Sequence, residues 1–167
     1  WEILSAGSFL KENDFDNTTR GILHSYNFLT QKPLIYVCNV DENSIQSGNK
    51  LSKEVSYHAQ KKKCKSINIS AAIEAEISQI IDENEKQEFL LSLNMEQTSL
   101  SRLIEEGYGL LDLITFFTSG PKESKAWSCK KGTKAPDAGA KIHTDFRRGF
   151  IKAEVIGLED FLNYNGE

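Results

Sequence analysis

Residues 34–42 read LIYVCNVDE, and this stretch decides the fold of the first part of the chain. Its first five residues are apolar and rich in β-branched and aromatic side chains, a run typical of a strand covered on both faces in a parallel sheet. Pro33 restricts Lys32 to extended backbone, which favours entry into a strand. The polar residues of 39–49 predict a loop at the carboxyl end of this strand.

Helical patterns flank the strand on both sides. Apolar residues at helical spacing before it predict a helix that ends near Thr30, and residues 51–63 predict a helix that ends in three lysines. A second strand over 64–69 and a helix over 70–81 follow. The order predicts an α/β fold with a parallel sheet. Ligands bind beyond the carboxyl ends of the strands in such folds, so the loops after both strands are expected at one rim.

The chain changes character near residue 111. Residues 1–111 carry 11 Lys and Arg against 16 Asp and Glu, whereas residues 112–167 carry 9 against 8. A polar helical bridge over 82–108, with Gly107 as its C-cap, is predicted to join the two parts. Two structural units are therefore expected.

The second part has the pattern of a small α+β unit. A Ser-Gly-Pro turn between two β-rich stretches predicts a hairpin, and Pro136 suits the first turn of a helix. Five elements are expected, in the order strand, strand, helix, strand, helix: residues 113–118, 124–129, 136–142, 150–156 and 158–162. Residues 165–167 end the chain without a closing strand.

Composition sets wider limits on the function. The 167 residues are 39% hydrophobic, enough for a buried core, and the net charge of −4 argues against a chain-wide nucleic-acid binder. No apolar run approaches the roughly 20 residues that span a bilayer. The scattered Cys38, Cys64 and Cys129 are interpreted as reduced thiols of a soluble, cytoplasmic protein. No metal site is predicted, since neither the Cys nor the His residues show ligand spacing.

The clearest chemical signal is Asn39, directly after the first strand, together with Ser70 and Ala71 after the second. A carboxamide carries a planar acceptor and two donors, which can pair with N7 and the exocyclic group of a purine. The backbone of Ser70 and Ala71 could contact the other base edge. The alternative is structural, because an Asn at the end of a strand is commonly a turn residue.

Taken in order, these motifs resemble the YchF proteins, the Obg-like P-loop NTPases. Four stretches carry the resemblance: residues 30–42 (TQKPLIYVCNVDE), 70–76 (SAAIEAE), 108–123 (YGLLDLITFFTSGPKE) and 142–151 (IHTDFRRGFI). The resemblance implies part of a P-loop nucleotide-binding (G) domain followed by a TGS domain, which has the β-grasp fold. It divides the chain into the end of a helical insertion (1–30), the last part of the G domain with connecting helices (31–107) and a C-terminally incomplete TGS-like domain (108–167).

The resemblance further implies a cytoplasmic protein that binds and hydrolyses ATP or GTP with Mg²⁺. By family analogy Asn39 and Val40 contact the adenine base, Ser70 and Ala71 complete the pocket, and Glu42 is a neighbour. An Asp stands at the position of Glu42 in related GTPases, so guanine pairing is expected to weaken. No G-x-x-x-x-G-K-[ST] phosphate loop occurs in the chain, so we expect an internal piece without catalytic residues that is inactive alone.

A different function rests on the basic residues of the second part. TGS domains accompany ribosome-associated proteins, which implies contact of Lys130, Lys131, Arg147 and Arg148 with ribosomal RNA. The alternative function is therefore a non-enzymatic RNA- or protein-binding β-grasp module, and the structural alternative is a solvated face. The lysine run 61–63 is predicted to be a helix-end cluster rather than a binding site. Neither a membrane nor DNA is expected as a partner.

Overall fold

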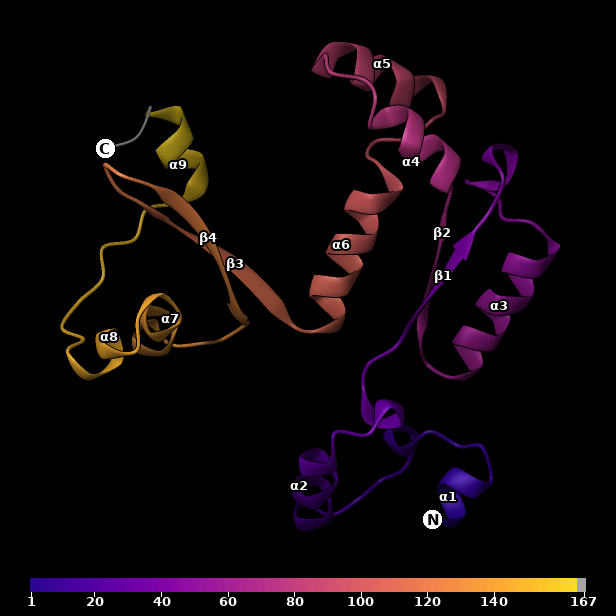
Figure 1. Cartoon of the computed structure of the whole chain (residues 1–167), viewed down its shortest axis with the longest axis horizontal. Helices are drawn as coiled ribbons and strands as arrows, with labels where there is room; N and C mark the ends of the chain where they lie inside the picture. Colours follow the sequence, from indigo (N-terminus) through magenta and orange to yellow (C-terminus); the bar gives the residue numbers. More distant parts are fainter. Residues whose placement is uncertain (165–167) are drawn as a thin grey trace. The chain divides into compact units, whose positions relative to one another are not determined.

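The computed structural model describes residues 1–164 (Figure 1). The chain divides into two compact units, Trp1–Leu111 and Asp112–Glu167. Their boundary lies where the charge balance of the sequence changes. Residues 165–167, where the sequence predicts no closing strand, lie outside the described residues.

A two-stranded parallel sheet lies at the centre of the first unit. β1 (Ile35–Asn39) pairs with β2 (Lys65–Ile69), in a register that sets Asn39 opposite Ile69. α3 (Lys50–Lys61) connects the strands and packs against both. Parallel strands require a crossover of this kind. The predicted order of strand, helix and strand is confirmed, and both strands end at the same edge of the sheet.

The core of the first unit lies where the loop after β1 meets the helices that follow β2. These helices are α4 (Ala71–Ile77), α5 (Glu83–Ser92) and α6 (Ser99–Leu110). The buried cluster consists of Val40, Ile45, Ile73, Ile77, Leu90 and Met95. The packing therefore fixes the β1 loop and α4 in one cluster.

Two helix ends in this region differ from the prediction. The helix expected over 70–81 ends at Ile77, and Ile81 is 95% exposed, so the apolar spacing continues beyond the helix without a packing partner. Gly107 is not a C-cap, because α6 continues through it to Leu110. The chain turns instead at Asp112, whose φ of 54° is in the left-handed region that ends helices.

The N-terminal segment of the first unit contains α1 (Glu2–Ser5), α2 (Asn17–Tyr26) and 3-10 turns at Leu10–Glu12 and Leu29–Gln31. The helix predicted to end near Thr30 ends at Tyr26. Asn27 adopts a left-handed φ of 54°, which stops the helix there. The apolar Leu29 belongs to the turn that leads into β1.

In the second unit, β3 (Leu113–Ser119) and β4 (Ser124–Lys130) form the predicted antiparallel hairpin. Three helices follow it: α7 (Ala135–Ile142), α8 (Asp145–Arg148) and α9 (Leu158–Asn163). Pro136 lies in the first turn of α7, where its missing N–H removes no helical hydrogen bond.

The prediction of a strand over 150–156 is wrong. Within the described residues this stretch pairs with no strand, and Ile151 and Val155 are 91% and 86% exposed. An isolated β-rich sequence has no ladder of backbone hydrogen bonds to keep it extended as a strand. Residues 112–164 therefore contain a hairpin and helices, without the third strand that a ββαβ order requires.

No helix within residues 1–164 is long and apolar enough to cross a membrane. The three cysteines are free thiols, of which Cys129 is buried and the other two are partly buried.

The N-cap of α2 makes a pH-dependent contribution to helix stability. The Thr19 hydroxyl, followed by the Thr19 and Thr18 backbone N–H groups, donates to the Asp16 carboxylate and lowers its pKa below 3.8. A lowered folded-state pKa gives stability that is present above the unfolded-state pKa and lost as pH falls through the lowered value. We expect Asp16→Asn, which keeps a capping side chain, to remove this acid transition. NMR titration of the α2 amides measures it.

Glu96→Gln is the control, because it removes one negative charge from an exposed side chain that forms no ion pair with a described residue. An acid transition in α2 that survives Asp16→Asn, or that disappears in Glu96→Gln, would contradict the assignment to Asp16.

Candidate functional site

The two strand ends meet through a side chain of β1. The backbone N–H of Ala71, at the start of α4, donates to Oδ1 of Asn39 over 3.0 Å. The backbone N–H of Val40 donates to the Ile69 carbonyl oxygen over 2.9 Å. A backbone N–H pairs only with the oxygen of a carboxamide, so this contact fixes which way the Asn39 amide faces.

The remaining groups of this carboxamide face solvent. Asn39 is exposed, and its Nδ2 has no hydrogen-bond partner among residues 1–164. The amide therefore offers two N–H donors, while Oδ1 keeps a second lone pair. N7 is an acceptor in both purines, and the exocyclic group of adenine is a donor. The free groups of Asn39 thus match the N7 edge of adenine.

Val40, Ser70 and Ala71 differ in which of their groups can contact a base. Val40 is only 8% exposed and packs in the core cluster, so any contact with a base comes from its backbone. Ser70 is fully buried, and its Oγ accepts the Ile73 N–H at 3.5 Å as the N-cap of α4. Its hydroxyl therefore serves the helix. Ala71 is exposed and presents backbone at the rim.

Glu42 lies apart from the Asn39 and Ala71 pair. It opens a 3-10 turn, Glu42–Ser44, and its side chain is exposed. The turn is held by Asp41, whose Oδ2 accepts the Ser44 hydroxyl at 2.9 Å. The structure joins the two strand ends that carry Asn39, Val40, Ser70 and Ala71, while Glu42 has no hydrogen bond or ion pair to Asn39 or Ala71 within residues 1–164.

Glu74 is a residue whose structural role the sequence did not reveal. Its Oε1 accepts the backbone N–H of Ser99, the first residue of α6, at 2.6 Å. Carboxylates stabilise helix N-termini through the unpaired N–H groups and the dipole. Glu74 thereby ties α4, and with it Ala71, to α6. The start of α6 at Thr98 and Ser99 is a signal that the sequence contains. The sequence does not show that Glu74 accepts the Ser99 N–H.

The basic residues of the second unit come from three places. Lys130 ends β4, Lys131 lies in the following turn, and Arg147 and Arg148 end α8. All four are exposed. The Arg147 Nε is 3.0 Å from Asp137 Oδ1, an ion pair that partly neutralises it. The other three form no ion pair with a described residue.

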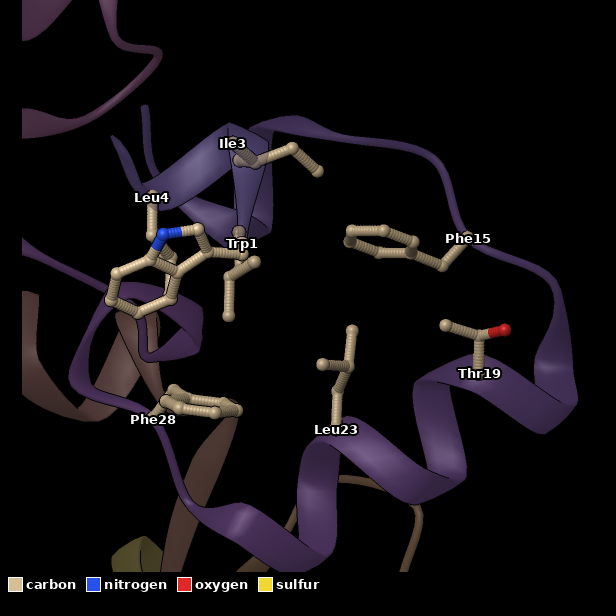
Figure 2. Close-up of a pocket in the computed structure, with 8 residues that line it drawn as sticks. Trp1, Ile3, Leu4, Phe15, Thr19, Leu23 and Phe28 are labelled. Atoms are coloured by element: carbon tan, nitrogen blue, oxygen red, sulfur yellow. The ribbon is translucent and has the colours of Figure 1, made fainter. Parts of the chain in front are cut away.

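Two hollows of the first unit lie away from Asn39 and Ala71. An apolar hollow of about 290 Å³ lies in the N-terminal segment, where Trp1, Phe15, Leu23 and Phe28 surround an open centre (Figure 2). A polar hollow of about 530 Å³ is lined by Lys11, Glu12, Asn13, Asp14, Lys61, Lys62 and Lys63. Neither hollow includes Asn39 or Ala71, and both of these residues are exposed.

The residues at the rim fit a purine base but not a triphosphate with its metal. Asn39 and Ala71 supply base-edge groups. The sequence has no glycine-rich phosphate loop. Within residues 1–164 no group of three His, Cys, Asp or Glu side chains is placed to hold a metal ion.

Comparison with known proteins shows what the chain is similar to. The family model YchF-GTPase_C, described as a protein of unknown function (DUF933), matches residues 113–167. The chain is 44% identical to "Ribosome-binding ATPase YchF" of Haemophilus influenzae over 165 residues, which are 99% of this chain and 45% of that protein. It is 42% identical to "Obg-like ATPase 1" of Xenopus laevis, over 89% of this chain and 38% of that protein.

A solved structure supports the same relationship. The YchF GTPase of Schizosaccharomyces pombe matches with a TM-score of 0.77 and 32% identity, over 94% of this chain and 42% of that one. The chain therefore spans less than half the length of the curated relatives it matches. The sequence identity, the family model and the shared fold agree with one another, and the chain belongs to the YchF and Obg-like ATPase family.

Proposed function

We propose that this chain supplies the base-recognition edge and the C-terminal part of a cytoplasmic, ribosome-associated protein that binds and hydrolyses ATP or GTP. The observation that carries the proposal is the contact between Asn39 Oδ1 and the Ala71 N–H, which leaves the carboxamide donors free at the rim. The names of the relatives, ribosome-binding ATPase and Obg-like ATPase, support nucleotide and ribosome as the two partners.

The rim favours adenine over guanine. The carboxamide can donate to N7 and accept from the adenine amine, whereas guanine has an acceptor at that second position. Discrimination in favour of guanine would need a carboxylate on the opposite base edge. Glu42 is the candidate for that role, but among residues 1–164 no hydrogen bond or ion pair joins it to Asn39 or Ala71. Val40, Ser70 and Ala71 complete the proposed base site.

Binding by this chain alone is expected to be weak, because it holds base contacts without phosphate contacts. In P-loop NTPases the phosphate loop and Mg²⁺ position and neutralise the triphosphate, and these supply the hydrolysis. The residues of this chain hold and orient the base. A good bidentate base contact contributes about 1 to 3 kcal/mol of discrimination.

The base site can be tested with two substitutions of one residue. Asn39→Asp keeps an oxygen for the Ala71 N–H but removes the Nδ2 donors, and Asn39→Ala removes both. We expect ATP to shift the Ala71 amide and Asn39 side-chain NMR signals of the native chain, with CTP, which lacks N7, having little effect. Either substitution should weaken ATP binding about 5- to 150-fold, the equivalent of about 1 to 3 kcal/mol.

Asn84→Ala is the control for the loss of a carboxamide, since Asn84 is an exposed residue of α5. ATP binding that is unchanged in Asn39→Asp would show that Asn39 is a turn residue without a role in base recognition.

A second candidate function is binding of RNA or protein by the second unit without hydrolysis. The favouring observation is the exposure of Lys130, Lys131 and Arg148, each free of ion pairs within residues 1–164. Lys125 also stacks on the Trp127 ring, with Nζ 4.3 Å from its centroid, which places a cation and an aromatic surface together on β4. Such pairs suit phosphates and bases.

Glutamine substitution of all four cations, Lys130, Lys131, Arg147 and Arg148, tests the ribosome contact. Ribosome co-sedimentation should fall about tenfold or more, because each lost phosphate contact removes a counterion-release contribution. Glutamine substitution of Lys122, Lys134, Lys141 and Lys152 is the control, because it removes the same number of charges from exposed lysines of the same unit. An equal fall in the control and the fourfold variant would show that net charge, rather than these residues, governs binding.

A further inference from the structure

The polar hollow of the first unit has more cationic than acidic residues, although the first unit as a whole has more acidic ones. We define the lysine hollow as Lys11, Glu12, Asn13, Asp14, Lys61, Lys62 and Lys63. It holds four lysines and two carboxylates, whereas residues 1–111 as a whole carry 11 cationic and 16 acidic residues. Lys61 to Lys63 come from the end of α3, and the rest come from the turn after Phe9.

Contacts within the protein hold two of the lysines in place. Lys62 Nζ lies 3.1 Å from Glu12 Oε2 and 5.4 Å from the centroid of the Phe9 ring. Lys11 Nζ donates to Cys64 Sγ over 3.0 Å and lies 5.6 Å from the same ring. These contacts join residues about fifty positions apart in sequence, so they tie the N-terminal segment to the end of α3.

The other two lysines, Lys61 and Lys63, are exposed and form no ion pair with a described residue. Lys61 lies over the Tyr57 ring, 4.3 Å from its centroid. Lys63 has a left-handed φ of 52°. The end of a helix accounts for cations at this position. It does not account for Lys11, which reaches the same hollow from another element.

The lining of the hollow indicates the class of ligand. Small-molecule pockets are mostly apolar with a few polar groups, but none of the seven lining residues is apolar. The four ammonium groups of its lining suit a polyanion held by charge. The carboxylates of Glu12 and Asp14 would repel phosphates, yet they can accept hydrogen bonds from ribose 2′-hydroxyls. Ammonium groups beside carboxylates therefore fit an RNA backbone better than a DNA backbone.

We propose that the lysine hollow binds the phosphate backbone of an RNA strand, with Lys61 and Lys63 as phosphate contacts and Asp14 as an acceptor for a 2′-hydroxyl. Asp14 is fully exposed, and its partner Arg20 lies at 3.3 Å. This inference rests on the proposed function, because ribosome association is the reason for choosing RNA as the polyanion. It goes beyond the expectation that the lysine run 61–63 is a helix-end cluster, which α3 itself fits.

The test measures binding of fluorescein-labelled oligouridylate to the full 167-residue chain by anisotropy, between about 50 and 200 mM salt. Lys61→Gln with Lys63→Gln should lower the slope of log K against log salt by about 1.4, or about 0.7 per phosphate contact on a single strand. The affinity should fall roughly 10- to 25-fold at about 0.1 M salt. Lys50→Gln with Lys53→Gln is the matched control, since both are exposed lysines in the first turn of the same helix.

Three outcomes would overturn the inference. The first is an equal loss in the two double variants at equal helicity, which would assign binding to net charge. The second is absence of RNA binding by the native chain. The third is equal affinity for oligodeoxyuridylate, or displacement of RNA by a polyglutamate peptide at the same charge concentration, which would make the hollow a general anion site.

Ribosome co-sedimentation of the native chain separates this inference from the proposed function. Oligouridylate binding that depends on Lys61 and Lys63, without sedimentation, supports the hollow and contradicts ribosome association. Sedimentation that persists while oligouridylate binding is unaffected by the Lys61 and Lys63 substitutions contradicts the hollow and leaves ribosome association standing.

Discussion

The parallel register of β1 and β2 is the constraint on which the candidate site depends. Asn39 lies opposite Ile69, so the chain leaves both strands at the same level of the sheet. Only this register brings the Ala71 N–H within hydrogen-bond distance of the Asn39 carboxamide. A slip of one residue would turn Asn39 toward the other face of the sheet and separate the two groups. The geometry of the site therefore depends on the pairing of the two strands as well as on the residues themselves.

Packing around the strand ends maintains this register. Val40, directly after Asn39, is buried in the core with Ile73 of α4, and burial of such a side chain contributes about 1.5 to 3 kcal/mol. Ser70 caps α4 from a fully buried position. Glu74 fixes the same helix to the start of α6. An exposed amide that is to recognise a ligand gains from such support, because side chains held by their neighbours lose less entropy on binding.

The parts of the fold that the sequence predicted are those set by local patterns. The apolar run 34–38 and the β-rich 64–69 give the strands Ile35–Asn39 and Lys65–Ile69. The prediction that the first strand is covered on both faces is wrong for the described residues, because Val37 is 42% exposed. The strand predicted over 150–156 had the same local pattern, but a strand also needs a partner, which local sequence does not supply. The shared rim of the two strand-end loops was predicted from the sequence, but the hydrogen bond between Ala71 and Asn39 was not. The contact of Glu74 with Ser99 joins residues 25 positions apart, and no periodic pattern in the sequence predicts it.

The net charge of the first unit does not predict where its lysines cluster. Interactions between exposed charges fade over a Debye length of about 8 to 10 Å at physiological salt, so a ligand responds to the groups near it rather than to the sum over the protein. The first unit is acidic overall, yet Lys11, Lys62 and Lys63 line one hollow. Lys11 reaches it only because the N-terminal segment folds back against the end of α3, where Lys62 pairs with Glu12. The tertiary contact, and not the composition, therefore creates the local field.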